Sequence, residues 1–365
     1  ATGGGVITVQ NTGGNITASV AGAAAANVKY TALTKGVVNL TATNTGGLTS
    51  TVTNAGVIAD ALTSTITLGN AVSGKSNDVT IKDTVATLNV TGGTGVDNII
   101  LTGAQVKSGT ISLGTGTDSV DFTGILGAAS GLTAAGVVIN LGSTAYKIDA
   151  GTAYETSVAA GHAVEYNAAA GTTTKKLVTD GFDLTLSGVE KVTGTANADI
   201  IIANAEGSTI IGGNGADKII SGAGADTIIL TEGVSAADTV IFTAVSNSAA
   251  SVAANTTVTF DTITDFATTV DKLNIADINT ALTGAAAATA VAAVTTKAIG
   301  GATVVNDFAG LVTAAGALTA SAPAGIQAYY IDLTTNTGAL GTGTYLVINN
   351  NNTTLDANDV MIQLT

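Results

Sequence analysis

The stretch IIGGNGADKIISGAGADTIIL, residues 210–230, contains the pattern that decides the fold. It consists of two successive nonapeptides, GGNGADKII and SGAGADTII. Both place an aspartate at position 6 (Asp217 and Asp226) and an isoleucine at position 8 (Ile219 and Ile228). Such regular spacing indicates a structural repeat with a period of nine residues.

The same register extends backwards through three more nonapeptides, to residue 185. Position 6 of the five repeats holds Glu190, Asp199, Ser208, Asp217 and Asp226. Position 8 holds Val192, Ile201, Ile210, Ile219 and Ile228. A single Gly-rich turn with an aspartate is common, but five nonapeptides in one phase are a strong signal.

The period has a geometric reason. A short strand followed by a Gly-rich turn makes half a coil of a parallel β-helix, in which position 8 points inward and must be apolar. The glycines allow positive φ and expose backbone carbonyls, and position 6 sets a carboxylate beside them. Turns two repeats apart stack, so two carboxylates and several carbonyls surround one ion with about six oxygens, a Ca²⁺-type shell.

The stacking rule ranks the expected sites. Asp199 and Asp217 are two repeats apart and should share one strong Ca²⁺ site. Asp226 should stack on Ser208, a weaker ligand, with Glu206 close by, and Glu190 should approach Ser208 from the other side. The turn positions expected to supply further ligands are Gly212, Asn214, Gly222 and Ala223.

Three other segments repeat the motif. GGTGVDNII (92–100) carries Asp97, LGTGTDSVD (113–121) carries Asp118, and GVSAADTVI (233–241) carries Asp238. Asp118 follows Asp97 by 21 residues, and Asp238 follows Asp217 by the same interval, which is two repeats plus three residues. We therefore expect each pair to stack if a three-residue bulge intervenes, adding further Ca²⁺ sites.

The nonapeptides resemble the RTX repeat G-G-x-G-x-D-x-U-x of calcium-binding secreted proteins. SGVEKVTGTANADIII resembles the usual lead-in to such arrays, and ITDFATTVDKLNI (263–275) resembles the segment that follows them. The resemblance implies Ca²⁺-dependent folding outside the cell and type I export through an uncleaved C-terminal signal. It also adds Asp265 and Asp271 as metal-site residues. Ser208 and Glu190 depart from the family pattern, which has aspartate there.

The fold expected for the whole chain is mainly β, a parallel β-helix or β-roll solenoid with β-rich flanking domains. Thr- and Asn-rich segments alternating with Val, Ile or Leu recur with Gly and Asn turns every eight to twelve residues. We expect a solenoid or sandwich unit over 1–127, an irregular insertion over 128–184, a Ca²⁺ β-roll over 185–245 and a β-rich domain over 246–365. Asn306 and the apolar residues after it predict one short helix near the C-terminus.

Composition narrows the function. The net charge is −14, all 12 basic residues are Lys, and 21 of the 26 acids are Asp. The absence of Arg and of a basic patch argues against nucleic acid, and no apolar run is long enough to cross a membrane. The chain begins with Ala, so we expect a fragment or processed product, whose missing N-terminal part would bind cell-surface polysaccharide.

The C-terminal segment TYLVINNNNTTLDANDVMIQLT and the Thr-, Ala-, Gly- and Asn-rich composition resemble RTX-type bacterial S-layer proteins. That resemblance implies a structural protein on the surface of a Gram-negative-type bacterium, which assembles with itself into a Ca²⁺-dependent lattice. Asp356 and Asp359 are either further ligands or turn residues.

Other classes fit less well. No histidine-based triad, P-loop or zinc motif surrounds the single histidine, His162, so we expect no enzyme. An RTX adhesin, or the calcium-binding module of a type I-secreted protein, is the alternative. An ice-binding solenoid would need more regular T-x-T rows than this sequence has.

Overall fold

The computed structural model describes residues 6–11, 16–21, 26–32, 38–42, 46–54, 63–82, 84–125, 136–153, 155–167, 176–178, 181–248, 260–267, 269–275, 294–299, 327–333, 342–349 and 359–365. The chain divides into two compact units. The first comprises residues 1–202 and 211–217, and the second comprises residues 203–210 and 218–365. The predicted short helix after Asn306 lies outside the described residues.

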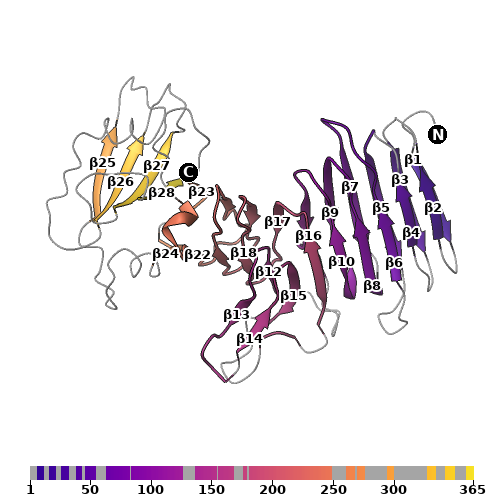
Figure 1. Cartoon of the computed structure of the whole chain (residues 1–365), viewed down its shortest axis with the longest axis horizontal. Coiled ribbons are helices and arrows are strands. Elements are labelled where there is room, and N and C mark those ends of the chain that lie inside the picture. The colour runs from indigo at the N-terminus through magenta and orange to yellow at the C-terminus, as the bar shows by residue number, and fades with distance from the viewer. Residues whose placement is uncertain are drawn as a thin grey trace. The chain divides into compact units, whose positions relative to one another are not determined.

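The first unit is built from two parallel sheets whose strands alternate along the chain, as the stacked arrows of Figure 1 show. One sheet contains, in spatial order, β1 (Val6–Asn11), β3 (Ala26–Ala32), β5 (Leu48–Asn54), β7 (Ser76–Lys82), β9 (Val96–Ile100), β11 (Ser119–Asp121) and β17 (Lys191–Thr193). Each strand pairs in parallel with the strand one full coil later. This is the connectivity of a β-solenoid, and the mainly β, parallel fold expected from the sequence is confirmed.

The second sheet of this unit contains, in spatial order, β2 (Ile16–Val20), β4 (Val38–Ala42), β6 (Thr63–Thr67), β8 (Thr84–Thr91), β10 (Gln105–Ser112), β16 (Asp183–Ser187), β15 (His162–Tyr166), β12 (Gly136–Asn140) and β18 (Ile200–Ile202). Strand β15 runs antiparallel to both of its neighbours, β12 and β16. It therefore interrupts an otherwise parallel sheet.

The interruption comes from the segment between β11 and β17. That segment contributes β12, β15 and β16 to the second sheet, and a hairpin of β13 (Tyr146–Ile148) and β14 (Thr156–Val158) projects from it (Figure 1). In the first sheet β11 pairs directly with β17, with Val120 opposite Val192. The first sheet therefore continues across the insertion without a gap.

The second unit continues the same alternation with shorter strands. Its sheets contain β19 (Thr209–Ile211), β21 (Thr227–Ile229) and β23 (Asp261–Thr264) on one face, and β20 (Lys218–Ile220), β22 (Thr239–Ile241) and β24 (Lys272–Asn274) on the other. A single turn of 3₁₀ helix, η2, spans Val245–Ser248. On the first face β23 pairs with β28 (Val360–Leu364), which begins an antiparallel meander with β27 (Gly343–Asn349) and β26 (Gln327–Leu333); β25 (Val294–Ile299) pairs in parallel with β26.

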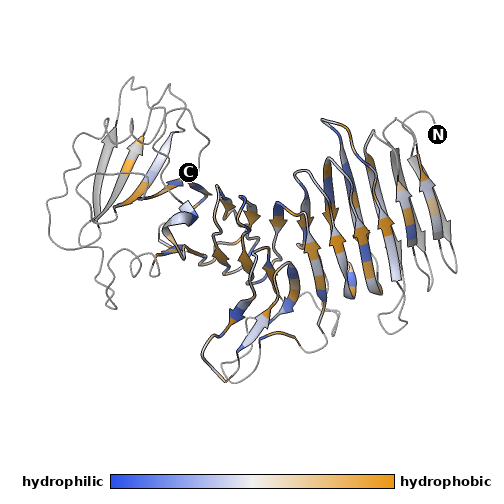
Figure 2. Ribbon diagram, viewed as in Figure 1, coloured by the Kyte–Doolittle hydropathy of each residue, from blue (hydrophilic) through white to orange (hydrophobic). Residues whose placement is uncertain are grey.

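The core consists of the inward-facing residues of every coil. In β7 buried and half-buried side chains alternate, as a strand requires when one face lines the core. Hydrophobic residues, orange in Figure 2, recur on successive strands of the stack. The turns between the sheets consequently hold the polar residues, and those turns carry the candidate site.

Candidate metal centre in the turns of the roll

The nonapeptides fold as half coils in the register that the sequence predicts. All five position-8 side chains are fully buried: Val192, Ile201, Ile210, Ile219 and Ile228. Each lies at the centre of a three-residue strand. The strands are this short because six of the nine residues form the turn.

The position-6 carboxylates are buried as well, which is unusual for aspartate. Asp199 is 1% exposed, Asp217 2% and Asp226 1%. Two kinds of hydrogen bond hold them. Asp199 and Asp226 each accept, through Oδ2, the N–H of the residue four positions earlier in the same turn. Asp217 and Asp226 each accept, through Oδ1, the N–H of the position-6 residue one coil away. The carboxylates therefore stack in columns along the turns.

Asp199 and Asp217 form the pair that the sequence predicts. The Asp199 N–H donates to Asp217 Oδ1 at 2.8 Å, and Thr195 N–H donates to Asp199 Oδ2 at 2.5 Å. Val137 of the insertion also donates its N–H to Asp199 Oδ1, at 2.6 Å. Despite these bonds, burial raises the pKa of Asp199 to about 7.

Asp226 stacks on Ser208, as predicted, because Ser208 N–H donates to its Oδ1 at 2.6 Å. Its other neighbour is a further acid, Asp261, whose Oδ1 accepts the Asp226 N–H at 2.8 Å. Ser221 Oγ lies 3.0 Å from Asp226 Oδ2 and 2.5 Å from Asp261 Oδ2, and one hydroxyl proton cannot serve both oxygens. The two carboxylates therefore form a coupled pair.

The pair's protonation follows from its burial. Burial raises the pKa of Asp226 to about 6. Burial first, and the charge of Asp226 second, raise the pKa of Asp261 to about 8. Without a cation, the pair therefore retains a shared proton near neutral pH.

A second column in the first unit joins two acids from outside the five-repeat block, Asp97 and Asp118, to Glu190 of its first repeat. The Asp97 N–H donates to Asp118 Oδ1 at 2.7 Å, so the two residues stack across their 21-residue interval as predicted. The Asp118 N–H donates to Glu190 Oε2 at 2.9 Å. Burial raises the pKa of Asp97. Burial first, and the charges of Asp97 and Glu190 after it, raise the pKa of Asp118 to about 6.

Asp238 and Asp271 stack in the second unit, where Asp238 N–H donates to Asp271 Oδ1 at 3.1 Å. Asp271 Oδ2 accepts the N–H of Ala267 at 2.8 Å. Asp265 does not join this column. It has a positive φ of 60° and accepts a hydrogen bond from Thr231.

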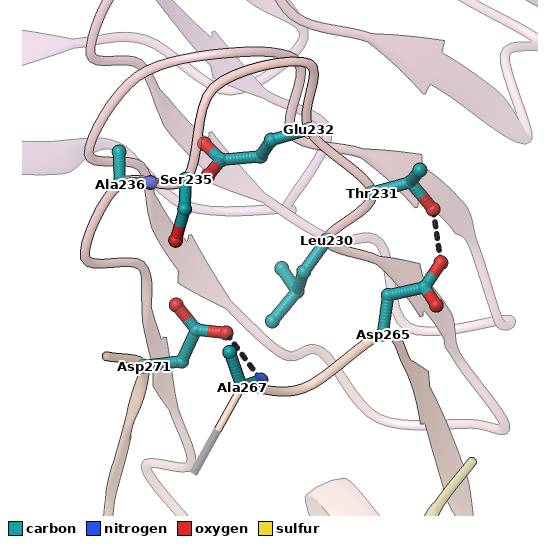
Figure 3. A pocket seen from close by; sticks show the side chains of 8 residues that line it. All are labelled: Leu230, Thr231, Glu232, Ser235, Ala236, Asp265, Ala267 and Asp271. Atoms are coloured by element: carbon teal, nitrogen blue, oxygen red, sulfur yellow. Dashed lines mark hydrogen bonds between the residues drawn. The ribbon is translucent and has the colours of Figure 1, made fainter. Parts of the chain in front are cut away.

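Asp265 and Asp271 instead line opposite sides of a pocket of about 260 Å³, together with Glu232 (Figure 3). The other lining residues are Leu230, Thr231, Ser235, Ala236 and Ala267. Ala236 N–H donates to Glu232 Oε2, so each of the three acids already accepts a hydrogen bond within this wall.

Glycines let neighbouring turns of the roll approach one another closely. Gly194 is the clearest case, because a Cβ there would overlap both the carbonyl oxygen of Gly212 and Oδ2 of Asp199. Gly92 is placed in the same way, against Leu113 O and Asp97 Oδ2. In both columns a carboxylate and a carbonyl of the next turn thus converge on a space that only glycine leaves open.

The remaining predicted ligand positions also lie in these turns. Gly212 is next to Asp217 Oδ2, and Gly222 N–H donates to Asp226 Oδ2 at 3.1 Å. Asn214 and Ala223 are half-buried at position 3 of their turns, and Glu206, expected near Asp226, is exposed. Their roles as metal ligands remain predictions.

The sequence register missed one column member, Asp261, and one contact, that of Glu190 with Asp118. Asp261 lies 35 residues after Asp226, although the Asp-x-Ile spacing of 261–263 carries the repeat's signature. The sequence predicts Glu190 beside Ser208 and does not predict that the Glu190 carboxylate accepts the N–H of Asp118. The insertion separates Glu190 from Asp118 by 72 positions, so no fixed period connects them.

The donor chemistry fits a hard cation. Among the residues that the structure describes, no three His, Cys, Asp or Glu side chains converge on one point. The paired carboxylates and the backbone carbonyls of the adjoining turns present oxygen donors, which suit Ca²⁺ better than Zn²⁺, whose sites use nitrogen and sulfur.

Comparison with known families agrees with this chemistry. Residues 193–228 match the RTX calcium-binding nonapeptide repeat, with four copies. The chain therefore carries calcium-binding repeats of a kind typical of secreted extracellular proteins. No curated protein matches the sequence. No helix in the described part of the chain has the length and apolar character to cross a membrane.

Proposed function

We propose that this chain is a structural cell-surface protein whose folding and self-assembly depend on extracellular Ca²⁺. The observation that carries the proposal is the burial of carboxylates without counter-charge. Asp97, Asp118, Asp199, Asp226 and Asp261 are all at most 1% exposed, and no lysine of the described residues forms an ion pair with them. An ionised carboxylate buried without a partner costs several kcal/mol.

A bound Ca²⁺ supplies the missing positive charge. Asp199 and Asp217 would hold it with turn carbonyls such as that of Gly212, and Asp226 and Asp261 would hold another. The turns themselves do the rest: their N–H groups orient the carboxylates, and their glycines bring successive coils together. Without the ion, repulsion between carboxylates and the entropy of Gly-rich turns favour unfolding of the short coils of the roll.

This dependence suits export. Low cytosolic calcium would keep the chain unfolded for type I secretion through a C-terminal signal, and millimolar external calcium would fold it at the cell surface. Thr-, Ala-, Gly- and Asn-rich strands throughout the chain, and the lack of a catalytic motif, favour a lattice subunit of an S-layer over an enzyme. The proposed partner is a further copy of the same chain, with neither nucleic acid nor membrane insertion involved.

Circular dichroism tests the folding half of the proposal. The β signal of the metal-stripped chain should be much weaker than that of the chain in millimolar Ca²⁺, and Asp217→Asn should raise the Ca²⁺ concentration needed to restore it. Asp121→Asn is the matched control, because the Asp121 carboxylate accepts the N–H of Thr123 and, in the described part of the chain, makes no hydrogen bond to a column member. Equal β content with chelator and with Ca²⁺ would refute the proposal.

Electron microscopy tests the lattice half. Ordered two-dimensional sheets should form when Ca²⁺ is added to the concentrated chain and should dissolve in EGTA. A chain that folds with Ca²⁺ yet stays monomeric at high concentration would point instead to an adhesin or a calcium-binding module.

A further inference from the structure

The base of the insertion carries a feature that the matched repeats do not include. Strands β11 and β17 pair there across the whole inserted segment, and the turns that precede them carry Asp118 and Glu190. The backbone is tied at the same point, since the N–H groups of Glu190 and Lys191 both donate to Asp118 O, at 3.1 and 2.9 Å. This position lies outside residues 193–228, where the repeat family matches.

Asp118 lacks a hydrogen bond that four of the column members make. Asp97, Asp199, Asp226 and Asp271 each accept the N–H four positions earlier in their own turn. Asp118 Oδ1 accepts from Asp97 N–H, but its Oδ2 is buried and has no hydrogen-bond partner among the described residues. A fully buried carboxylate oxygen without a donor requires a cation or a proton.

The neighbouring groups supply oxygens and no positive charge. Glu190 is half-buried and its carboxylate reaches the Asp118 turn, while no lysine pairs with either acid in the described part of the chain. Gly188 has a positive φ of 62°, and a Cβ there would lie 2.5 Å from Gly114 O. The closing turn thus presses against a carbonyl of the Asp118 turn through a position that only glycine fits.

At the N-terminal end of this column, one of two stacked turns carries a carboxylate and the other carries an amide. Asn77 occupies the column position before Asp97, and its Nδ2 donates directly to Asp97 Oδ1 at 2.6 Å. An amide therefore bridges that interval by a hydrogen bond. Asp118 and Glu190 are both carboxylates, so neither side chain can donate such a hydrogen bond to the other when both are ionised.

We propose that Asp118 and Glu190, with carbonyls of the adjoining turns, bind a divalent cation of the calcium type that clasps the two ends of the insertion. The ion would join strands β11 and β17, so closure of the inserted segment would depend on Ca²⁺. The clasp would bind the same kind of ion as the sites of the proposed function, but it rests on different residues.

Calorimetric titration of the metal-stripped full chain with CaCl₂ tests the clasp. Asp118→Asn and Glu190→Gln should each bind one Ca²⁺ fewer than the wild type. The double variant should also lose only one, because both side chains serve the same ion. Asp121→Asn, three residues from Asp118, should bind the wild-type number.

Stability gives a second readout that a merely structural role would not produce. In chelator, Asp118→Asn should be at least as stable as the wild type, because it removes a buried charge and its amide can donate. In saturating Ca²⁺ it should be less stable, with hydrogen exchange accelerated in β11 and β17. If Asp118→Asn does not fold, Glu190→Gln alone decides by the same count.

The outcomes separate the two proposals. Wild-type stoichiometry in both Asp118→Asn and Glu190→Gln overturns the clasp. If Asp217→Asn still loses an ion in that case, the calcium-dependent roll stands. If Asp217→Asn also binds the wild-type number, the proposed function falls as well.

Discussion

At the scale of single residues, the aspartates of the columns are buried, whereas aspartate is usually exposed, and backbone N–H groups donate hydrogen bonds to their carboxylates. The donors at Asp199 are the N–H groups of Thr195 and Val137 and the hydroxyl of Thr195. These bonds favour the ionised form, yet burial outweighs them and raises the pKa of Asp199 to about 7. A side chain of this kind binds either a proton or a cation when the chain is folded.

The first prediction concerns pH. Because the folded-state pKa of Asp199 lies above the value of about 4 expected in the unfolded chain, its contribution to stability is present at low pH and is lost as pH rises through 7. In metal-stripped protein, the free energy of unfolding should therefore be greater at pH 5 than at pH 8, by about 2–3 kcal/mol for this one group.

Urea titrations of metal-stripped protein at several pH values measure this slope. Asp199→Asn should reduce the slope by the share of this one group, and saturating Ca²⁺ should remove the slope, because the cation competes with the proton. A stability that increases with pH in the metal-stripped wild type would contradict the prediction.

The second prediction concerns Gly194. Gly194→Ala places a Cβ against Gly212 O and Asp199 Oδ2, so the stacked turns must separate. We expect a loss of about 3 kcal/mol or more in Ca²⁺-saturated protein, measured by thermal unfolding. Gly74→Ala is the control, since it meets no atom within 4 Å and carries only the cost of its positive φ, about 1–2 kcal/mol. Equal losses would show that the space at Gly194 is not critical.

At the scale of elements, the insertion depends on one buried amide. Asn140, at the end of β12, places its Nδ2 at 2.9, 3.2 and 3.1 Å from Thr144 O, Val158 O and Ala159 O, so that its two N–H groups serve three acceptors and one N–H is shared. Its Oδ1 accepts the N–H of Gly142. One side chain thereby holds both ends of the β13–β14 hairpin.

The third prediction is that Asn140→Asp opens this hairpin, because a carboxylate cannot donate and would face three carbonyls. Limited proteolysis should cut within 141–160 at least about tenfold faster, which corresponds to about 1.4 kcal/mol of lost protection. Ca²⁺ binding by Asp217 should persist. Thr144→Ala is a suitable control, since Asn140 uses only the backbone carbonyl of Thr144. An unchanged cleavage rate would show that the amide is dispensable.

Elements also show which parts of the site the sequence predicts. The nine-residue period predicts the stacking of Asp199 on Asp217, and the interval of 21 residues predicts that of Asp97 on Asp118. Both predictions succeed because the length of a coil determines which turns lie next to each other. The placement of Glu190 escapes this reasoning. Its column partner is set by β11 pairing with β17, a long-range pairing that leaves no periodic trace in the sequence.

At the scale of the molecule, the strands differ in how much core they contribute. Strands β7 and β8 have seven and eight residues, with Val79, Ile81, Leu88 and Val90 at most 1% exposed. Strands β20 and β21 have three residues each, centred on Ile219 and Ile228. Since a buried aliphatic side chain contributes about 1.5–3 kcal/mol, the long coils hold together with less help from metal than the short ones.

The last prediction follows from this contrast and from the additive stability of stacked coils, in which each coil contacts only its neighbours. Hydrogen exchange followed by mass spectrometry in EGTA should retain amide protection over 76–91 and lose it over 218–229, and adding Ca²⁺ should restore protection in the second region. Asp217→Asn should reproduce the loss locally at moderate Ca²⁺, whereas Asp121→Asn should not. Loss of protection in both regions at the same Ca²⁺ concentration would mean that the ion holds the whole roll as one cooperative body.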